Sequence, residues 1–96
     1  MFGTVYRLQT KPGKKEEAKR SMMLEDRRIN GAVAFYLFDT SGDELWGTAV
    51  FEDEKTYRAN ANDPEQDKWY GKLREFLVAD PEWHDGNIQA WPGNCS

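Results

Sequence analysis

The pattern of apolar and polar positions predicts a strand and then a helix at the start of the chain. Residues 2–10 are rich in β-branched and aromatic side chains and end at the turn signal 11–13, which reads Lys-Pro-Gly. Residues 14–29 are mostly good helix formers, and Asn30-Gly31 stops this predicted helix. Three of its apolar residues are spaced to share one face: Ala18, Met22 and Ile29.

A nearly continuous apolar run predicts a second strand that is covered on both faces. Residues 32–38 lack the alternation that is typical of a strand with one solvent-exposed face. The polar segment 39–43 predicts a hairpin turn, and residues 45–51 predict an antiparallel return strand.

Two helices and a last strand are predicted in the second half of the chain. The first helix covers residues 53–61. The second begins at Asp63, which is followed by proline at the first helical position and glutamine at the third. Four apolar residues recur on one face before Asp80-Pro81 ends this helix: Trp69, Leu73, Phe76 and Leu77. Residues 87–91 predict the last strand.

The order of these elements, βαββαβ, predicts the fold class. It is typical of a single α+β, ferredoxin-like domain over residues 1–96, in which a four-stranded antiparallel sheet carries the helices on one face. The strand at 32–38 is nevertheless apolar on both sides. We therefore expect a second copy to bury the open face, giving a homodimer joined through the sheet faces, a dimeric α/β barrel.

Composition and charge exclude several classes of partner. Thirteen basic and 17 acidic residues give a net charge of −4, and the basic residues are scattered or paired with carboxylates, so we expect no nucleic-acid partner. No apolar run is long enough for a membrane span and no targeting segment precedes the first strand, so we expect a cytoplasmic protein with no membrane partner. Cys95 is the single cysteine, which excludes a multi-cysteine metal site within one chain.

The stretch 49–60 joins the fold to a candidate site. Asp53 is suited to cap a helix that follows directly on a strand, and Tyr57 is then expected to point inward. Asn60 follows about one turn later, so a phenol and an amide converge near the end of the strand, where small-molecule pockets are often built.

Aromatic residues with polar atoms are further candidates for lining a pocket between sheet and helices. Such side chains offer the flat apolar area and the hydrogen-bonding groups that a planar aromatic ligand prefers. The candidates are Tyr6, Trp46, Tyr57, Trp69 and Tyr70. The plainer interpretation, that Trp69 belongs to the core, stays open at this point.

Four short runs, 11–14, 51–54, 57–60 and 63–70, resemble in content and order those of the antibiotic biosynthesis monooxygenase-like family of dimeric α/β barrels. The resemblance spans nearly the whole chain and implies the same fold. That family includes cofactor-free quinol and anthrone monooxygenases, haem-degrading enzymes and many small proteins with no assigned reaction, so the fold alone does not select an activity.

The resemblance also implies roles for individual residues. Tyr57 occupies the position of a pocket tyrosine in the anthrone-oxidising members, and Arg74 is similar to a helix-borne arginine that holds the substrate. Phe51 replaces the tryptophan usual in those members, and Gly47 replaces an asparagine on the same strand. Trp69 is expected to stack on the substrate ring.

No metal or cofactor is implied for this chain. The haem-degrading members place a histidine ligand about ten residues after a helix tryptophan, and here Val78 and Ala79 occupy that region. The single histidine, His84, comes too late and is interpreted as a surface or turn residue, and only weakly as a catalytic base.

Two functional hypotheses follow. The first is a cofactor-independent monooxygenase that acts on a planar phenolic, quinol or anthrone-type molecule. Tyr57, Trp69 and Arg74 are its catalytic candidates, and its substrate-binding candidates are Tyr6, Trp46, Phe51, Asn60 and Tyr70. The alternative is a non-catalytic, dimeric ligand-binding or stress-associated protein of the same fold.

Overall fold

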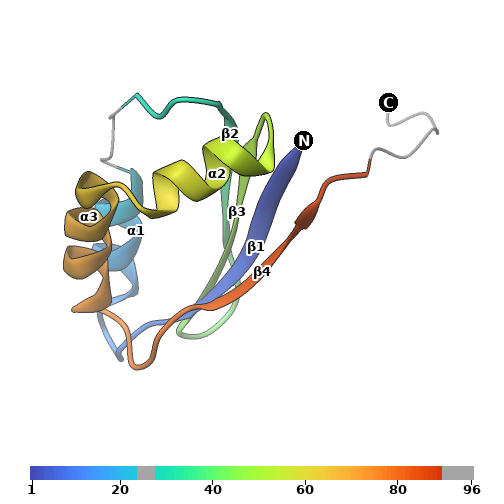
Figure 1. Ribbon diagram of the computed structural model, residues 1–96. Coiled ribbons are helices and arrows are strands. Elements are labelled where there is room, and N and C mark those ends of the chain that lie inside the picture. The colour runs from blue at the N-terminus through green and yellow to red at the C-terminus, as the bar shows by residue number, and fades with distance from the viewer. Residues whose placement is uncertain (24–27, 90–96) are drawn as a thin grey trace.

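The computed structural model describes residues 1–23 and 28–89 (Figure 1). Within these residues, strands and helices follow one another in the order β1, α1, β2, β3, α2, α3, β4. Their bounds are Phe2–Gln9, Lys15–Met23, Ala32–Asp39, Glu44–Phe51, Glu54–Ala61, Pro64–Arg74 and Glu82–Asn87. No helix in the described part of the chain is long and apolar enough to cross a membrane.

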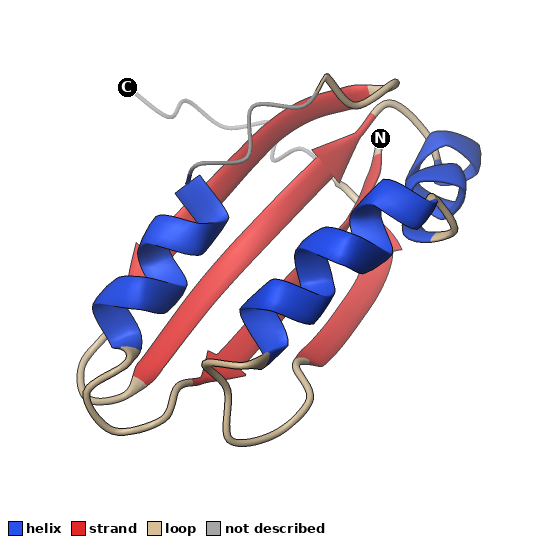
Figure 2. Ribbon diagram, turned by 90° about the vertical axis from the view of Figure 1, so that its left-hand side faces the viewer, coloured by secondary structure: helices blue, strands red, loops and turns tan. Residues whose placement is uncertain are grey.

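The four strands form one antiparallel sheet in the order β2-β3-β1-β4. Helices α1 and α3 lie side by side on one face of the sheet, and α2 lies at one end of it (Figures 1 and 2). This arrangement confirms the predicted ferredoxin-like α+β fold.

The core lies between this sheet face and the helices. Alternate residues of β1 point toward α1 and α3, and the register places Tyr6 opposite Gly47 and Leu8 opposite Leu45 of β3. The buried cluster consists of Tyr6, Leu8, Ala18, Leu45, Leu73 and Leu77. Full burial of each leucine contributes about 1.5–3 kcal/mol, so this cluster is the main source of stability for the helix layer.

The opposite face of the sheet is open in the single chain, and the expectation that a second copy covers it stays a prediction. Tyr36 and Phe38 of β2 lie on the open face, opposite Thr48 and Trp46 of β3, and are more than half exposed. Phe35 is also half exposed, but it lies on the helix side, where its ring meets Phe51. Since β2 pairs only with β3, it is an edge strand, and the described residues of one protomer leave Tyr36 and Phe38 uncovered.

Two predicted helices are shorter than expected. The first was predicted to reach Ile29, whereas α1 covers Lys15–Met23 and residues 24–27 lie outside the described part. Ile29 instead belongs to a turn, because its carbonyl oxygen accepts from the Ala32 amide at 3.2 Å and Gly31 has a φ of 81°.

Helix α3 ends at Arg74 rather than at Asp80 because the chain after it pairs with the end of β1. The Phe76 carbonyl accepts from the Lys11 amide at 2.8 Å, and the Val78 amide donates to Gln9 at 2.9 Å. These bonds replace helical ones and bring Leu77 opposite Thr10.

The last strand was also misplaced by the sequence pattern, since β4 covers Glu82–Asn87 and not residues 87–91. Main-chain hydrogen bonds to β1 hold this strand, with Val5 opposite His84 and Gly3 opposite Gly86. An edge strand needs no apolar alternation to form such hydrogen bonds. The polar sequence of β4 therefore gave no pattern from which the strand could be predicted. Residues 90 and 91 lie outside the described part.

Candidate functional site

The end of the sheet under α2 carries the candidate site. Asp53 caps α2 as predicted: its backbone is extended, and its Oδ1 accepts from the Thr56 amide at 2.8 Å. This hydrogen bond is the main cause of the lowered pKa of the Asp53 carboxyl. The cap fixes the start of the helix and therefore the position of Tyr57, one turn further on.

Four aromatic rings meet at this end and form what we call the aromatic cluster: Phe2, Phe35, Phe51 and Tyr57. The ring centroid of Tyr57 lies 5.2 Å from that of Phe2 and 5.5 Å from that of Phe51. Phe35 meets Phe51 edge-on at 5.9 Å. Phe51 is fully buried, while Phe35 is half exposed, so the cluster runs from the core to the surface.

The Tyr57 hydroxyl belongs to a group of three side chains that we call the α2 trio: Tyr57, Arg58 and Asp85. Tyr57 Oη donates to Asp85 Oδ1 at 2.8 Å, and Arg58 Nη1 lies 3.2 Å from Asp85 Oδ2. The Arg58 guanidinium also lies over the rings of Phe2 and Tyr57, at 5.4 and 5.3 Å. Its other nitrogens bind Glu54 at 3.3 Å.

The protonation states within the α2 trio are fixed by burial and by these contacts. Burial, followed by the hydrogen bond to Asp85, raises the pKa of Tyr57 to about 12. Burial opposes ionisation of Asp85, but hydrogen bonds from Tyr57 and Thr4 together with the Arg58 charge outweigh it and lower the pKa of that carboxyl. At neutral pH the trio therefore holds a neutral phenol against an ionised carboxylate.

Two other predicted site residues form a second group, the α3 trio: Tyr70, Arg74 and Asp80. Tyr70 Oη donates to Asp80 Oδ1 at 3.2 Å, and Arg74 Nε donates to the same oxygen at 2.9 Å. Arg74 also donates to the carbonyl of Leu77 at 3.0 Å. Arg74 thus closes the end of α3.

The α3 trio lies at the other end of β1 from Tyr57, because Leu77 pairs next to the end of that strand whereas Tyr57 packs on its first residue, Phe2. Arg74 and Tyr70 were predicted to share a cavity with Tyr57, but the structure does not bring them close to it.

The remaining predicted residues are dispersed. Trp69 packs against the core cluster, and its Nε1 donates to the Ser21 carbonyl at 3.4 Å. Trp46 lies on the open face of the sheet, where its Nε1 donates to Glu44 at 2.7 Å. The prediction that Trp46 lines a pocket on the helix side is therefore wrong, because strand alternation places it on the other face.

Tyr6 is buried in the core, where burial raises its pKa to about 12, and its ring lies 5.0 Å from that of Trp83. The position of Tyr6 also explains why residue 47 is a glycine, since a Cβ there would collide with the Tyr6 phenol. Tyr6 thus fills the space beside Gly47.

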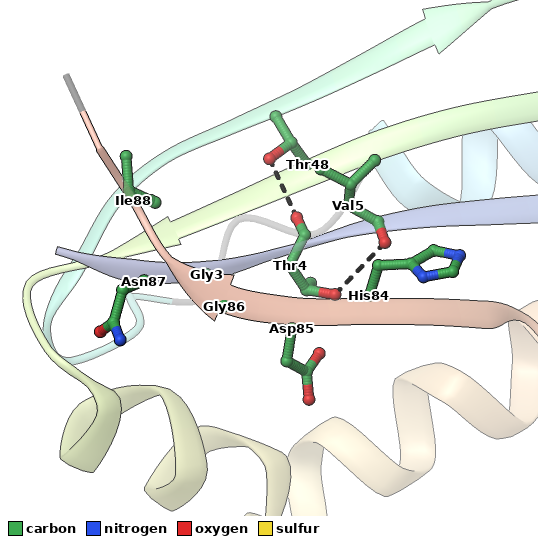
Figure 3. A pocket seen from close by; sticks show the side chains of 9 residues that line it. All are labelled: Gly3, Thr4, Val5, Thr48, His84, Asp85, Gly86, Asn87 and Ile88. Atoms are coloured by element: carbon green, nitrogen blue, oxygen red, sulfur yellow. Dashed lines mark hydrogen bonds between the residues drawn. The ribbon is translucent and has the colours of Figure 1, made fainter. Parts of the chain in front are cut away.

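The described residues line at least two cavities. One, of about 210 Å³, lies beside α2 and includes Asn60. The other, of about 160 Å³, lies at β1 and β4 around the paired Gly3 and Gly86 (Figure 3). In Figure 3, Val5, Thr48 and Ile88 extend on the side of the sheet away from the helices, whereas Asp85 and Asn87 point toward the helices.

Sequence reasoning missed two members of the α2 trio. Asp85 falls in the strand that was misplaced, and Arg58 was noted only as part of a motif. Its spacing of four residues from Glu54 was a signal for the observed ion pair, but nothing local in the sequence links Arg58 to Asp85. Among residues 1–23 and 28–89, no group of three or more His, Cys, Asp and Glu side chains is arranged to hold a metal ion.

The sequence matches no protein-family model and no curated protein. Solved structures, in contrast, are similar over the whole chain. A protein from Deinococcus radiodurans superposes with a TM-score of 0.83 at 10% identity and covers 100% of both chains. One from Chloroflexus aurantiacus J-10-fl gives 0.79 at 17% identity, with 96% of each chain covered. Both carry the name "putative antibiotic biosynthesis monooxygenase".

The chain has the antibiotic biosynthesis monooxygenase-like fold. A protein of unknown function from Nitrosomonas europaea shares this fold with a TM-score of 0.76 at 16% identity, over 99% of this chain and 95% of its own. At such identities the likeness establishes the fold, so activity has to be argued from the site.

Proposed function

We propose that this protein is a cofactor-independent monooxygenase of a planar phenolic, quinol or anthrone-type compound. The observation that carries the proposal is the placement of Tyr57, whose ring belongs to a partly exposed aromatic cluster and whose hydroxyl is held by Asp85. A flat ligand stacked on Phe35 and Tyr57 brings its polar group next to that hydroxyl.

In this reaction the organic substrate supplies the electrons. An anthrone-type compound that has lost a proton is a carbanion, which adds dioxygen to give a peroxide anion. The peroxide takes a proton back and loses water, which leaves a carbonyl group. One oxygen atom enters the product and the other leaves as water. The protein contributes by orienting the ring, by stabilising charge near the reacting carbon and by excluding solvent.

In this proposal the predicted residues share these tasks differently from the sequence hypothesis. Tyr57 keeps its place as the group that bonds the substrate oxygen. Trp69 supports the helix layer from within, and Arg74 closes the end of α3. Arg58 lies over the Tyr57 ring and pairs with the carboxylate that holds the Tyr57 hydroxyl. We therefore assign to Arg58 the role of holding the substrate, which the sequence hypothesis gave to Arg74.

Oxygen uptake with a panel of anthrones and quinols tests the proposal. The wild-type protein is expected to consume one dioxygen per substrate, above the uncatalysed rate, after dialysis against a chelator. An uptake rate equal to that of the buffer for every compound contradicts the monooxygenase proposal.

A non-catalytic ligand-binding protein is the second candidate. It is favoured by Tyr6, which fills the space beside Gly47 that a polar side chain facing a substrate would need. Binding of planar aromatics by tryptophan fluorescence, without oxygen uptake, is the result expected for this candidate.

We also propose that the active form is a homodimer joined through the open sheet faces. Tyr36 and Phe38 expose 61% and 58% of their surface there. The hollow around Gly3 and Gly86 is bordered on the same face by Val5, Thr48 and Ile88 (Figure 3). Projecting rings and a hollow on one face allow a two-fold pairing of identical surfaces. A monomeric mass in light scattering at micromolar concentration contradicts this proposal.

A further inference from the structure

The single hydrogen of the Tyr57 hydroxyl already has a partner. A phenol carries one O–H donor, and here it points to Asp85 Oδ1 at 2.8 Å. What the hydroxyl offers to a ligand is therefore its oxygen lone pair, which accepts hydrogen bonds and donates none.

The charged groups around Asp85 keep this direction fixed. From α2, Tyr57 and Arg58 face the carboxylate, and Glu54 binds the far side of Arg58. From β1 the uncharged Thr4 faces both the carboxylate and the Tyr57 hydroxyl. On its own strand, Glu82 and His84 pair with each other at 2.8 Å, two positions apart and on the opposite side of the sheet. Asp85 thus stays an ionised acceptor at neutral pH.

We propose that Asp85 is a specificity-determining, positioning residue: by taking the Tyr57 proton it makes the site select aromatic ligands that carry a hydroxyl group over matched ligands whose oxygen only accepts. This inference rests on the proposed function, since it places the ligand against the aromatic cluster. It assigns the substrate to the hydroxyl-bearing, phenol or quinol form, and it predicts that a carbonyl product is held weakly and leaves.

The expected preference follows from the unmade hydrogen bond. A hydroxyl ligand donates to Tyr57 Oη, whereas an ether or carbonyl oxygen meets a second acceptor and gains nothing. Sites with a fully buried polar group discriminate by several orders of magnitude. Because the side chain of Asp85 is 29% exposed and Tyr57 is half-buried, water reduces the effect. We expect a preference of about tenfold, the scale of one net hydrogen bond.

Naphthol and its methyl ether, methoxynaphthalene, are suitable probes because they share the ring and differ in the donor. Both are bound by the wild-type protein in the absence of oxygen and followed by fluorescence titration. Naphthol is expected to bind about tenfold more tightly than the ether. Equal affinities for the two probes overturn the proposal.

Variants then locate the cause of the preference. Asp85→Ala frees the Tyr57 proton, so the ether gains a donor and the affinity ratio falls toward one. Tyr57→Phe keeps the ring and removes the hydroxyl, so it also brings the ratio toward one, and it tests the proposal if Asp85→Ala does not fold. Asp80→Ala, which removes the carboxylate of the α3 trio, is expected to keep the tenfold ratio. A collapse of the ratio in Asp80→Ala equal to that in Asp85→Ala contradicts the assignment.

The binding ratio separates this inference from the monooxygenase proposal. A wild-type protein that prefers naphthol but consumes no oxygen with any anthrone or quinol supports the role of Asp85 and overturns the oxygenase. Oxygen uptake without any preference between the two probes supports the oxygenase and overturns the role of Asp85.

Discussion

The two trios contain the same residue types, tyrosine, arginine and aspartate, but differ in setting. In the α2 trio the two oxygens of Asp85 are divided between Tyr57 and Arg58, and the carboxylate is 29% exposed. In the α3 trio both donors share one oxygen of Asp80, whose side chain is 82% exposed. The first lies against an aromatic cluster and the second at a helix end.

This difference shows that residue type alone does not identify a site. Arg74 is engaged by a main-chain carbonyl and by an exposed carboxylate, so it stabilises the exit from α3. Tyr57 and Asp85 are partly desolvated, which strengthens their hydrogen bond and perturbs both pKa values. The sequence hypothesis placed members of both trios in one cavity, whereas the fold separates them by the length of β1.

The largest effect is expected from removing the support of the α2 trio. Phe51→Ala deletes a fully buried ring that packs edge-on against Tyr57, so the free energy of unfolding should fall by about 3–5 kcal/mol. Urea denaturation measures this change. A loss below about 1 kcal/mol indicates that the aromatic cluster is not part of the cooperative core.

Tyrosine hydroxyls provide the sharpest comparison of the two trios. Tyr57→Phe keeps the ring, so stability should change by about 1 kcal/mol. Turnover of an oxidised substrate should fall about a hundredfold, because the hydroxyl oxygen that accepts from the substrate and orients it is lost. Tyr70→Phe, the matched control in the α3 trio, should leave turnover within about twofold of wild type, as expected for a group outside the reaction. Equal losses in both variants contradict the separation of the trios.

Acid should remove the contribution of Asp85 to stability. Its folded-state pKa is lowered from the ordinary 3.8, so the contribution is complete above that value and is lost as the pH falls through the folded-state pKa. The stability gap between wild type and Asp85→Asn is therefore expected to be constant near neutral pH and to shrink below about pH 4. Denaturation curves at several pH values measure it, and a gap that grows in acid contradicts the assignment.

The smallest expected effect concerns salt. Because Asp80 is far more exposed than Asp85, added salt should weaken the destabilisation caused by Asp80→Asn more strongly than that caused by Asp85→Asn. Thermal unfolding at low and high salt compares the two variants. The opposite order indicates that water reaches the α2 trio more freely than the α3 trio.

Local chemistry along the chain determined much of the fold. Asp53 and Asp63 accept hydrogen bonds from amides in the first turns of their helices, because a short carboxylate next to a helix start bonds nearby main-chain donors. Gly42 has a φ of 70° in the predicted hairpin turn, where a positive φ favours glycine. Apolar spacing likewise predicted the buried Leu73 and Leu77.

Tertiary structure decided what depends on long-range pairing. β4 is held by hydrogen bonds to β1, at the opposite end of the chain, so its polar sequence carried no local signal. The same pairing brings Asp85 to Tyr57, and the register of β3 sends Trp46 to the far face of the sheet. Caps and turns follow from neighbouring residues along the chain, whereas the α2 trio exists only because two strands of fixed register meet under a capped helix.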